Sequence, residues 1–229
     1  MTAMELMTLR APDFGRPARA GARRGWSRLV VLTCILGSAS CNAALREGRA
    51  STFLIIEQLS AASGADRTTF SNVLQSDVVT NVTNTTGGQA TLVPTIFEDV
   101  AQVIMRLGFN DPGTPGNPSS PTSANYITVD RYRVEFVRSD GRNRPGVDVP
   151  HPFDGGVTFS VLDIGSATFT LVRAQAKLEA PLLALRGAGG ALVISTIAEI
   201  TFFGHDQTGA EVSAMGRISV NFSDWGDPQ

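Results

Sequence analysis

Cysteine and lysine are scarce in this 229-residue sequence, and their scarcity restricts the chemistry open to the chain. The two cysteines, Cys34 and Cys41, both lie near the N-terminus. The chain after residue 41 therefore has no disulfide, no thiolate nucleophile and no cysteine metal ligand. Lys177 is the only lysine, and we interpret this as a coding bias rather than as a chemical feature.

Histidine is also scarce, which limits both triad and metal chemistry. Any Ser–His–Asp triad has to use one of the two histidines, and the nucleophile motif G-x-S-x-G does not occur. The candidate ligands for a metal or for calcium match no known spacing; they are His151, His205, Asp111, Asp154, Asp163 and Asp206. We therefore expect surface histidines, no metal, no cofactor and no catalytic residue, and we favour a non-enzyme without excluding an enzyme.

No hydrophobic run is long enough to cross a bilayer, since a spanning helix needs roughly 20 apolar residues. The main run, LVVLTCIL, covers only residues 29–36. The arginine-rich segment that ends in RRGWSR precedes it and the small residues GSAS follow it, which is the order of a secretory signal peptide. We predict a cleaved signal peptide over residues 1–40, with an uncertain start codon. A short buried core element and a twin-arginine signal are the alternatives.

The residues before Cys41 resemble the lipobox of bacterial lipoproteins. Ala39 and Ser40 fit this motif, whereas Ser38 stands where the family usually has Leu, Val or Ile. The resemblance implies a diacylglyceryl group on the Cys41 thiol, a lipidated tether over residues 41–50 and a membrane partner reached through that lipid. Asn42 in place of Asp favours the outer membrane. Ordinary cleavage after Ser40 is the alternative.

Positive charge is concentrated at the N-terminus. Six of the 19 basic residues precede residue 41, against two of the 21 acidic residues, so residues 41–229 have a net charge of −6. An acidic chain argues against general nucleic-acid binding, which needs a basic surface. One local basic group is a candidate patch for an anion or a partner: Arg131, Arg133, Arg138, Arg142 and Arg144. The alternative is a solvated sheet face whose arginines are balanced by nearby acids.

Strand patterns dominate the chain from residue 51 onward. Residues 51–60, 71–82 and 99–109 are rich in β-formers, and the polar residues 83–90 predict a turn or mobile loop. In residues 127–137, Tyr132, Val134 and Phe136 alternate with charged residues. We interpret residues 155–163 and 166–185 as further strand segments, followed by a glycine turn. Four prolines and two glycines in residues 110–125 predict a loop without regular structure.

The C-terminal residues predict a β-hairpin with one buried and one solvated face. It resembles the last two strands of bacterial immunoglobulin-like or fibronectin-type domains. About eight short strands separated by turns predict an all-β fold, an antiparallel β-sandwich over residues 51–224 with a tail at 225–229. The resemblance implies that this sandwich is immunoglobulin-like.

These features predict a membrane-anchored lipoprotein of the cell envelope, facing the periplasm or the cell surface. We expect its domain to be a non-catalytic binding or structural module, such as an accessory subunit of an envelope assembly with an envelope protein or polysaccharide as partner. A hydrolase of envelope polysaccharide is one alternative, and a convergent cleft of carboxylates would favour it. A soluble periplasmic carrier of an apolar ligand is the other, and it requires a cavity between the sheets. The fold alone does not decide between them.

Overall fold

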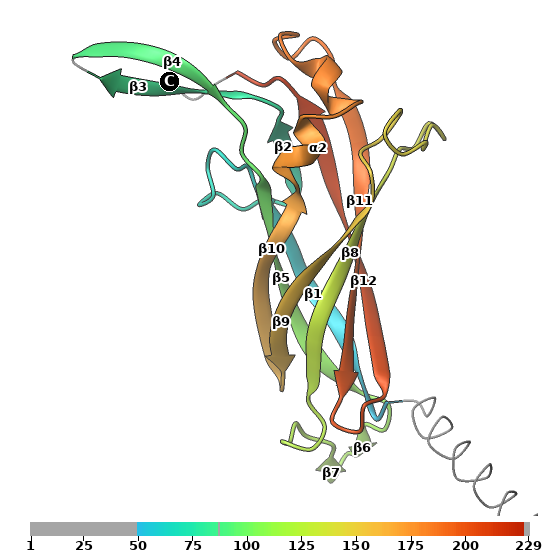
Figure 1. The fold of residues 1–229 in the computed structure, drawn as a ribbon. Helices are drawn as coiled ribbons and strands as arrows, with labels where there is room; N and C mark the ends of the chain where they lie inside the picture. Colours follow the sequence, from blue (N-terminus) through green and yellow to red (C-terminus); the bar gives the residue numbers. More distant parts are fainter. Residues whose placement is uncertain (1–49, 87, 227–229) are drawn as a thin grey trace, which may run out of the picture. The chain divides into compact units, whose positions relative to one another are not determined.

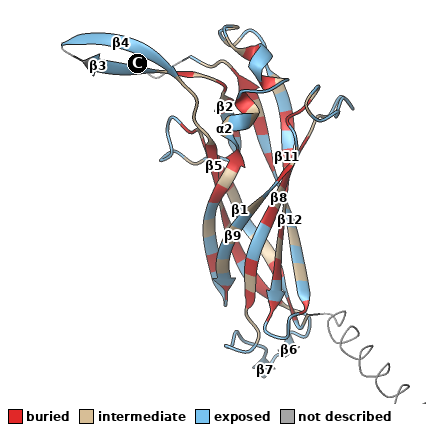
Figure 2. Cartoon of the chain, viewed as in Figure 1, coloured by how far each residue is buried: buried red, intermediate tan, exposed pale blue. Residues whose placement is uncertain are grey.

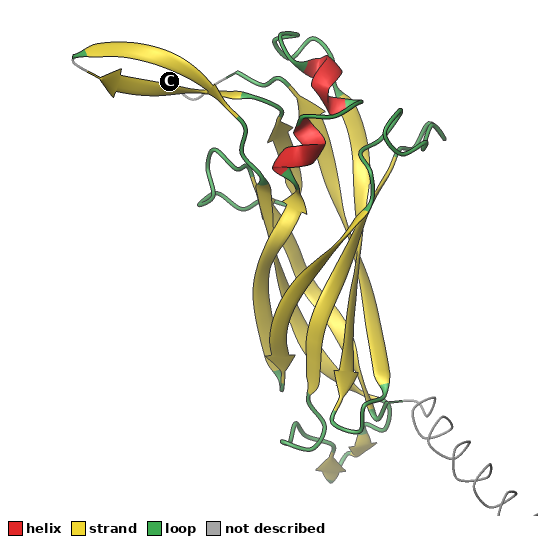
Figure 3. Cartoon of the chain, viewed as in Figure 1, coloured by secondary structure: helices red, strands yellow, loops and turns green. Residues whose placement is uncertain are grey.

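The computed structural model describes residues 50–86 and 88–226. The predicted signal peptide, the lipidation site Cys41 and the tether lie outside these residues, apart from residue 50 of the tether, as do residues 227–229 of the predicted tail. The chain divides into two units, residues 1–45 and 46–229, and we call the second unit the β domain. Strands form most of the β domain, so the all-β prediction is confirmed (Figure 3). Within the described part of the chain, no helix is long and apolar enough to span a membrane.

Two large sheets contain eight strands of the β domain (Figure 1). The first sheet has the order β1 (Thr52–Ala62), β5 (Asp99–Phe109) and β10 (Ile164–Val172). The second has the order β2 (Val73–Asp77), β12 (Glu211–Ser223), β11 (Ile194–Asp206), β8 (Ile127–Val137) and β9 (Phe153–Val161). All neighbouring strands are antiparallel except β2, which pairs in parallel with β12. The expectation of a wholly antiparallel fold is therefore wrong at β2.

The hydrophobic core lies between the two sheets, as the buried positions in Figure 2 show. Along β8, Tyr132, Val134 and Phe136 are buried, and the charged residues between them point to the opposite face. The same alternation runs along β12, so the predicted two-faced hairpin of β11 and β12 is confirmed. The face of the five-stranded sheet that points away from the core is called the outer face below.

Aromatic side chains join the two sheets in the middle of the core. The ring of Phe169 on β10 meets Phe202 on β11 edge-to-face, with centroids 5.2 Å apart, and Tyr132 on β8 lies 4.8 Å from Phe169. The Tyr132 hydroxyl donates a hydrogen bond to the Thr170 carbonyl oxygen at 3.1 Å. Burial raises the pKa of Tyr132, so this hydroxyl stays a neutral donor. Such aromatic contacts add about 0.5–1.5 kcal/mol per pair beyond simple burial.

The proline-rich segment contains regular structure, which corrects the prediction for residues 110–125. Strands β6 (Gly113–Thr114) and β7 (Asn117–Pro118) pair across a tight turn. Pro115 and Gly116 occupy the two middle positions of that turn, where proline fixes φ. Proline therefore initiates a hairpin here instead of preventing one.

Two further segments differ from the expectation. The polar residues 83–90 are largely strand, because β3 (Thr80–Thr86) and β4 (Gln89–Thr95) form a second small hairpin. Residues 166–185 are strand only as far as Val172; helix α2 (Ala174–Lys177) and the 3₁₀ helix η1 (Leu182–Leu185) follow. No β-branched residue occurs from 173 to 191, and the Ala, Leu, Gln and Lys there favour helix over strand.

Candidate functional site

A β-bulge in β8 builds the most distinctive site on the outer face. Val129 of β8 lies opposite Gly204 of β11, and Arg131 lies opposite Phe203, so Asp130 is an extra residue between them. A bulge of this kind turns two consecutive side chains to the same face of the sheet. Accordingly Asp130 and Arg131 are both exposed, although Val129 before them is buried.

Gly204 allows β11 to lie close to this bulge. A Cβ atom at residue 204 would lie 2.3 Å from the carbonyl oxygen of Thr128 and 2.9 Å from the Cα atom of Val129. Any side chain would force these strands apart. Glycine is therefore required by the close approach of two backbones, which is a common reason for glycine inside a strand.

Arg131 lies across the aromatic ring of Phe203. Its Cζ atom is 4.3 Å from the ring centroid, which is the geometry of a cation–π contact. Among the described residues, no carboxylate lies within ion-pair distance of Arg131. The ring thus holds a guanidinium group in place while its hydrogen-bond donors stay available to a ligand.

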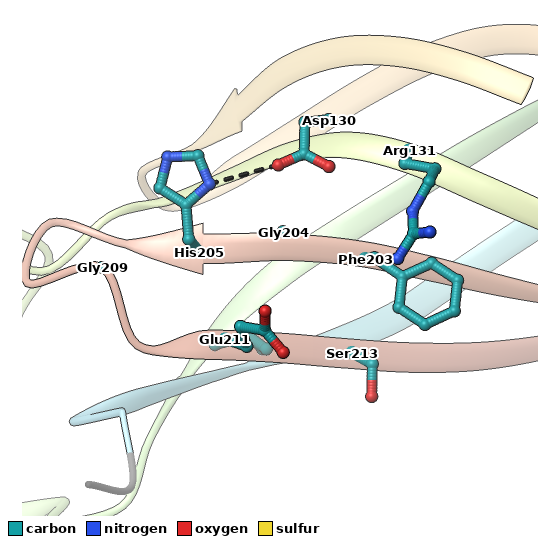
Figure 4. Close-up of a pocket in the computed structure, with 9 residues that line it drawn as sticks. Asp130, Arg131, Phe203, Gly204, His205, Gly209, Glu211 and Ser213 are labelled. Atoms are coloured by element: carbon teal, nitrogen blue, oxygen red, sulfur yellow. Dashed lines mark hydrogen bonds and ion pairs between the residues drawn. The ribbon is translucent and has the colours of Figure 1, made fainter. Parts of the chain in front are cut away.

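His205 forms the other side of the site. Its Nδ1 atom lies 3.2 Å from Oδ2 of Asp130, and both side chains are about half exposed. Glu211 lies directly opposite His205 on β12, and Ser213 lies opposite Phe203 (Figure 4). In Figure 4 the His205 ring turns toward Asp130 and away from Ser213. The arrangement therefore supplies a His–Asp pair without a hydroxyl nucleophile bonded to it in the described part of the chain.

The turn after His205 is fixed by Asp206, whose side chain points inward. Its Oδ1 atom accepts hydrogen bonds from the backbone N–H groups of Thr208 and Ala210 at 2.8 and 2.9 Å and from the Thr208 hydroxyl at 2.7 Å. Burial raises the pKa of Asp206, but these hydrogen bonds outweigh it and hold the pKa below its ordinary value. Gly209 closes the turn with a φ of 83°. Asp206 is therefore a turn residue and not a ligand on the surface.

Together these residues line an open cleft of about 570 Å³ on the outer face, which we call the outer cleft. Its lining consists of Asp130, Arg131, Phe203, Gly204, His205, Gly209, Glu211, Val212 and Ser213. A free guanidinium, an imidazole and two carboxylates thus converge on one hollow (Figure 4). Such a set can bind an anionic group while accepting hydrogen bonds from neighbouring hydroxyl groups.

The structure does not gather the predicted arginine patch into one cluster. Arg133 shares the outer face of β8 with Arg131, but it is paired with Glu135 at 2.7 Å and with Asp154 at 3.0 Å. The other three arginines lie beyond the end of β8, in the loop before β9. Only Arg131 of the predicted set therefore belongs to the outer cleft.

Acidic residues neutralise the three arginines of that loop. Arg138 and Arg142 both bind Asp140, at 2.6 and 2.8 Å, and Arg144 binds Asp148 at 2.9 Å. The hydrogen bonds from Arg138 and then Arg142 hold the pKa of Asp140 far below its usual range. The loop therefore presents paired charges, as expected of a solvated surface segment.

The residues considered as metal or calcium ligands are dispersed. Asp154 binds Arg133, Asp111 accepts a hydrogen bond from the Gly113 N–H at 2.9 Å, and the His151 ring packs over Gly146. Asp163 lies in the turn between β9 and β10. In residues 50–86 and 88–226, no group of three or more His, Cys, Asp or Glu side chains is placed to hold a metal ion.

Three features of the structure were not predicted, although two of them have a signal in the sequence. The spacing from Val129 to Tyr132 is three residues where alternation requires two, which is the mark of a bulge. Lys177 has a structural role that the interpretation as a coding bias did not predict, because its ammonium group binds the buried Asp99. Its signal is a single lysine in a segment that is otherwise rich in Ala and Leu. Nothing in the sequence indicates that Phe203 meets Arg131.

Comparisons with protein-family models, with curated proteins and with solved structures found no significant match to this chain. The function is therefore inferred from the residues of the outer cleft and from the chain's own sequence features.

Proposed function

We propose that the chain is a membrane-anchored lipoprotein of the cell envelope whose β domain is a non-catalytic binding module, with an anionic polysaccharide as the ligand of the outer cleft. The observation that carries this proposal is Arg131. Its guanidinium is held over Phe203 and has no carboxylate partner among the described residues, whereas the other arginines of the predicted patch are neutralised.

Arg131 gives the outer cleft a group that fits the anion of an acidic sugar. A guanidinium group binds a carboxylate, sulfate or phosphate through two parallel hydrogen bonds. Asp130 and Glu211 can accept hydrogen bonds from sugar hydroxyls beside that anion. The volume of about 570 Å³ lies within the usual range of ligand sites, and the open form of the cleft suits a polymer that passes through it.

The membrane anchor is the second part of the proposal. It is supported by the resemblance of residues 38–41 to a lipobox and by the basic, apolar and small segments before Cys41. Two or more acyl chains hold a protein stably at a membrane, which a single chain does not do. We propose that the lipid anchors the chain in the outer membrane and leaves the β domain free to meet envelope polymers.

We also propose that the two large sheets form an immunoglobulin-like sandwich. Eight strands in two sheets with a shared core support this, as does the closing hairpin of β11 and β12. The parallel pairing of β2 with β12 is the departure from two antiparallel sheets that a family relationship would have to accommodate.

Isothermal titration of the full chain with polygalacturonate tests the binding proposal, with neutral dextran as the control polymer. We expect binding to polygalacturonate that weakens as salt rises. Arg131→Ala should weaken it by about tenfold or more, since a charged hydrogen bond contributes about 1.5–3 kcal/mol. Arg142→Ala removes the same charge from a neutralised pair and should change affinity little. Equal loss in both variants, or no binding at all, would refute an anion site at Arg131.

A polysaccharide hydrolase is a second candidate, because two carboxylates and a histidine line the same cleft. Asp130 is about half exposed and already contacts His205, so it is not the enclosed carboxyl group that a general acid usually is. Release of reducing ends from purified cell-wall sacculi, abolished in both Asp130→Asn and Glu211→Gln, would establish this candidate. Turnover that survives in both variants, or no turnover in the parent chain, would dismiss it.

The carrier hypothesis receives no support from the core. The space between the sheets in the described part of the chain is filled by fully buried side chains, among them Met105, Ile200 and Phe202. The aromatic cluster around Phe169 occupies the position where an apolar ligand would have to lie. We therefore do not favour a soluble carrier.

A further inference from the structure

The hairpin of β3 and β4 stands apart from both large sheets. Its two strands pair with each other and, within the described residues, with no other strand. Figure 1 shows the hairpin extending from the end of the β domain opposite the start of β1. Its apolar side chains are exposed to solvent, with exposed fractions of 39% for Val82, 68% for Leu92 and 42% for Val93. An isolated two-stranded hairpin of this kind is only marginally stable in water and gains stability from a third strand.

The hairpin also has none of the charged side chains that normally protect a free edge. No Asp, Glu, Lys or Arg occurs from residue 78 to residue 97, a stretch that includes both strands. Exposed edge strands usually carry lysine or another charge, because unpaired backbone groups otherwise pair with another chain. The edges of the hairpin are therefore open to strand addition.

The two strands differ as pairing edges. Pro94 lies in β4 and has no N–H, so the row of backbone donors along β4 is interrupted. β3 contains only Thr, Asn and Val, and each of these residues carries a backbone N–H. Threonine and valine favour the extended conformation. β3 is therefore the better edge for a new strand.

Charge favours a second copy of this chain as the partner. Residues 41–229 have a net charge of −6, so two β domains repel each other over most of their surfaces. The hairpin carries no charged side chain, so two copies can approach there without repulsion between facing side chains. A strongly charged partner would gain no attraction at the hairpin itself.

We propose that β3 of one copy pairs antiparallel with β3 of a second copy about a two-fold axis, which joins the two hairpins into one four-stranded sheet. Two-fold pairing uses the same surface twice and closes the assembly as a dimer. The new sheet has β3 strands at its centre and β4 strands at its edges, where Pro94 removes one backbone donor, so further growth is disfavoured. This inference is independent of any ligand in the outer cleft.

Cysteine cross-linking in the full, membrane-bound chain tests this pairing. The chain after Cys41 has no cysteine, so one introduced cysteine gives an unambiguous signal above the parent chain. Four single variants, Val82→Cys, Thr83→Cys, Asn84→Cys and Thr85→Cys, cover the edge. We expect the variants nearest the two-fold axis to form a disulfide-linked dimer. The other variants should not form one, since only close pairs satisfy disulfide geometry. Thr158→Cys, exposed on β9, is the matched control and should stay monomeric.

A charge variant supplies the second test. Thr83→Lys places like charges near the axis, and light scattering of the detergent-solubilised full chain should then show a monomer where the parent shows a dimer. Thr158→Lys should remain dimeric. Any one of three results would overturn the proposal: no dimer at any of the four cysteine positions, a dimer that survives Thr83→Lys, or a cross-link to a protein of different mass.

Discussion

Lys177 and Asp99 form an ion pair inside the β domain, with Nζ 2.9 Å from each carboxylate oxygen. The two side chains are 1% and 0% exposed. Asp99 also accepts hydrogen bonds from the Gly64 N–H at 2.8 Å and from the Ser76 hydroxyl at 2.6 Å. The pair therefore connects the segment after β1, the strands β2 and β5, and helix α2 at one end of the two sheets. Both oxygens of the Asp99 carboxylate accept hydrogen bonds, and Lys177 balances its negative charge. A charge can be buried when both conditions are met.

Removing the cation should destabilise the fold strongly. Lys177→Met leaves the Asp99 carboxylate buried without a counter-ion, and we expect a loss of about 3–5 kcal/mol in the free energy of unfolding. Urea denaturation followed by circular dichroism measures it. Arg217→Met, which breaks the exposed pair with Glu199, is the control and should cost no more than about 1 kcal/mol. Equal costs in the two variants would show that the buried pair is not a special element of the fold.

The close approach at Gly204 predicts a position-specific effect of one methyl group. Gly204→Ala places a Cβ against the Thr128 carbonyl, and we expect a cost of about 1–3 kcal/mol together with a distorted outer cleft. Gly156→Ala on β9, which pairs with the other edge of β8, meets nothing within 4 Å and should be nearly neutral. Thermal melting of both variants measures the difference. A Gly204→Ala chain as stable as the parent would mean that the bulge is not held as described.

The Asp206 turn predicts a pH-dependent contribution to stability. Its pKa is lowered in the folded chain, so ionised Asp206 stabilises the fold above the unfolded pKa of about 3.9, and this stabilisation is lost as pH falls through the folded pKa. Asp206→Asn should therefore cost about 1 kcal/mol at neutral pH, and the difference from the parent should shrink below about pH 4. Asp163→Asn, on an exposed turn, is the control for urea titrations at several pH values. A difference that stays constant with pH would contradict the role of the charge.

The sequence could predict the elements whose pattern is local. The alternation around Val134 in β8 and along β12 identifies two strands and their buried faces, because side chains in a strand alternate between faces. Gly187, Gly189 and Gly190 all have positive φ, so the glycine turn after η1 is confirmed. These features need no knowledge of distant parts of the chain.

The parts that could not be predicted depend on contacts between distant residues. Arg131 meets Phe203 only because β8 and β11 are neighbours in the sheet, although they are far apart in the sequence. Lys177 and Asp99 meet for a similar reason, through the packing of α2 near the start of β5. The arginines of the loop before β9 look like a patch in the sequence, whereas the carboxylates that neutralise them emerge only from the geometry.

The most direct test of the central claim, that this chain is an envelope lipoprotein presenting a binding domain, is the intact mass of the N-terminal peptide from protein isolated from its native membrane. We predict a peptide that begins at Cys41 and carries a diacylglyceryl group. An unmodified N-terminus at or near Cys41 would contradict the anchor, and a peptide that retains residues 29–36 would contradict export itself.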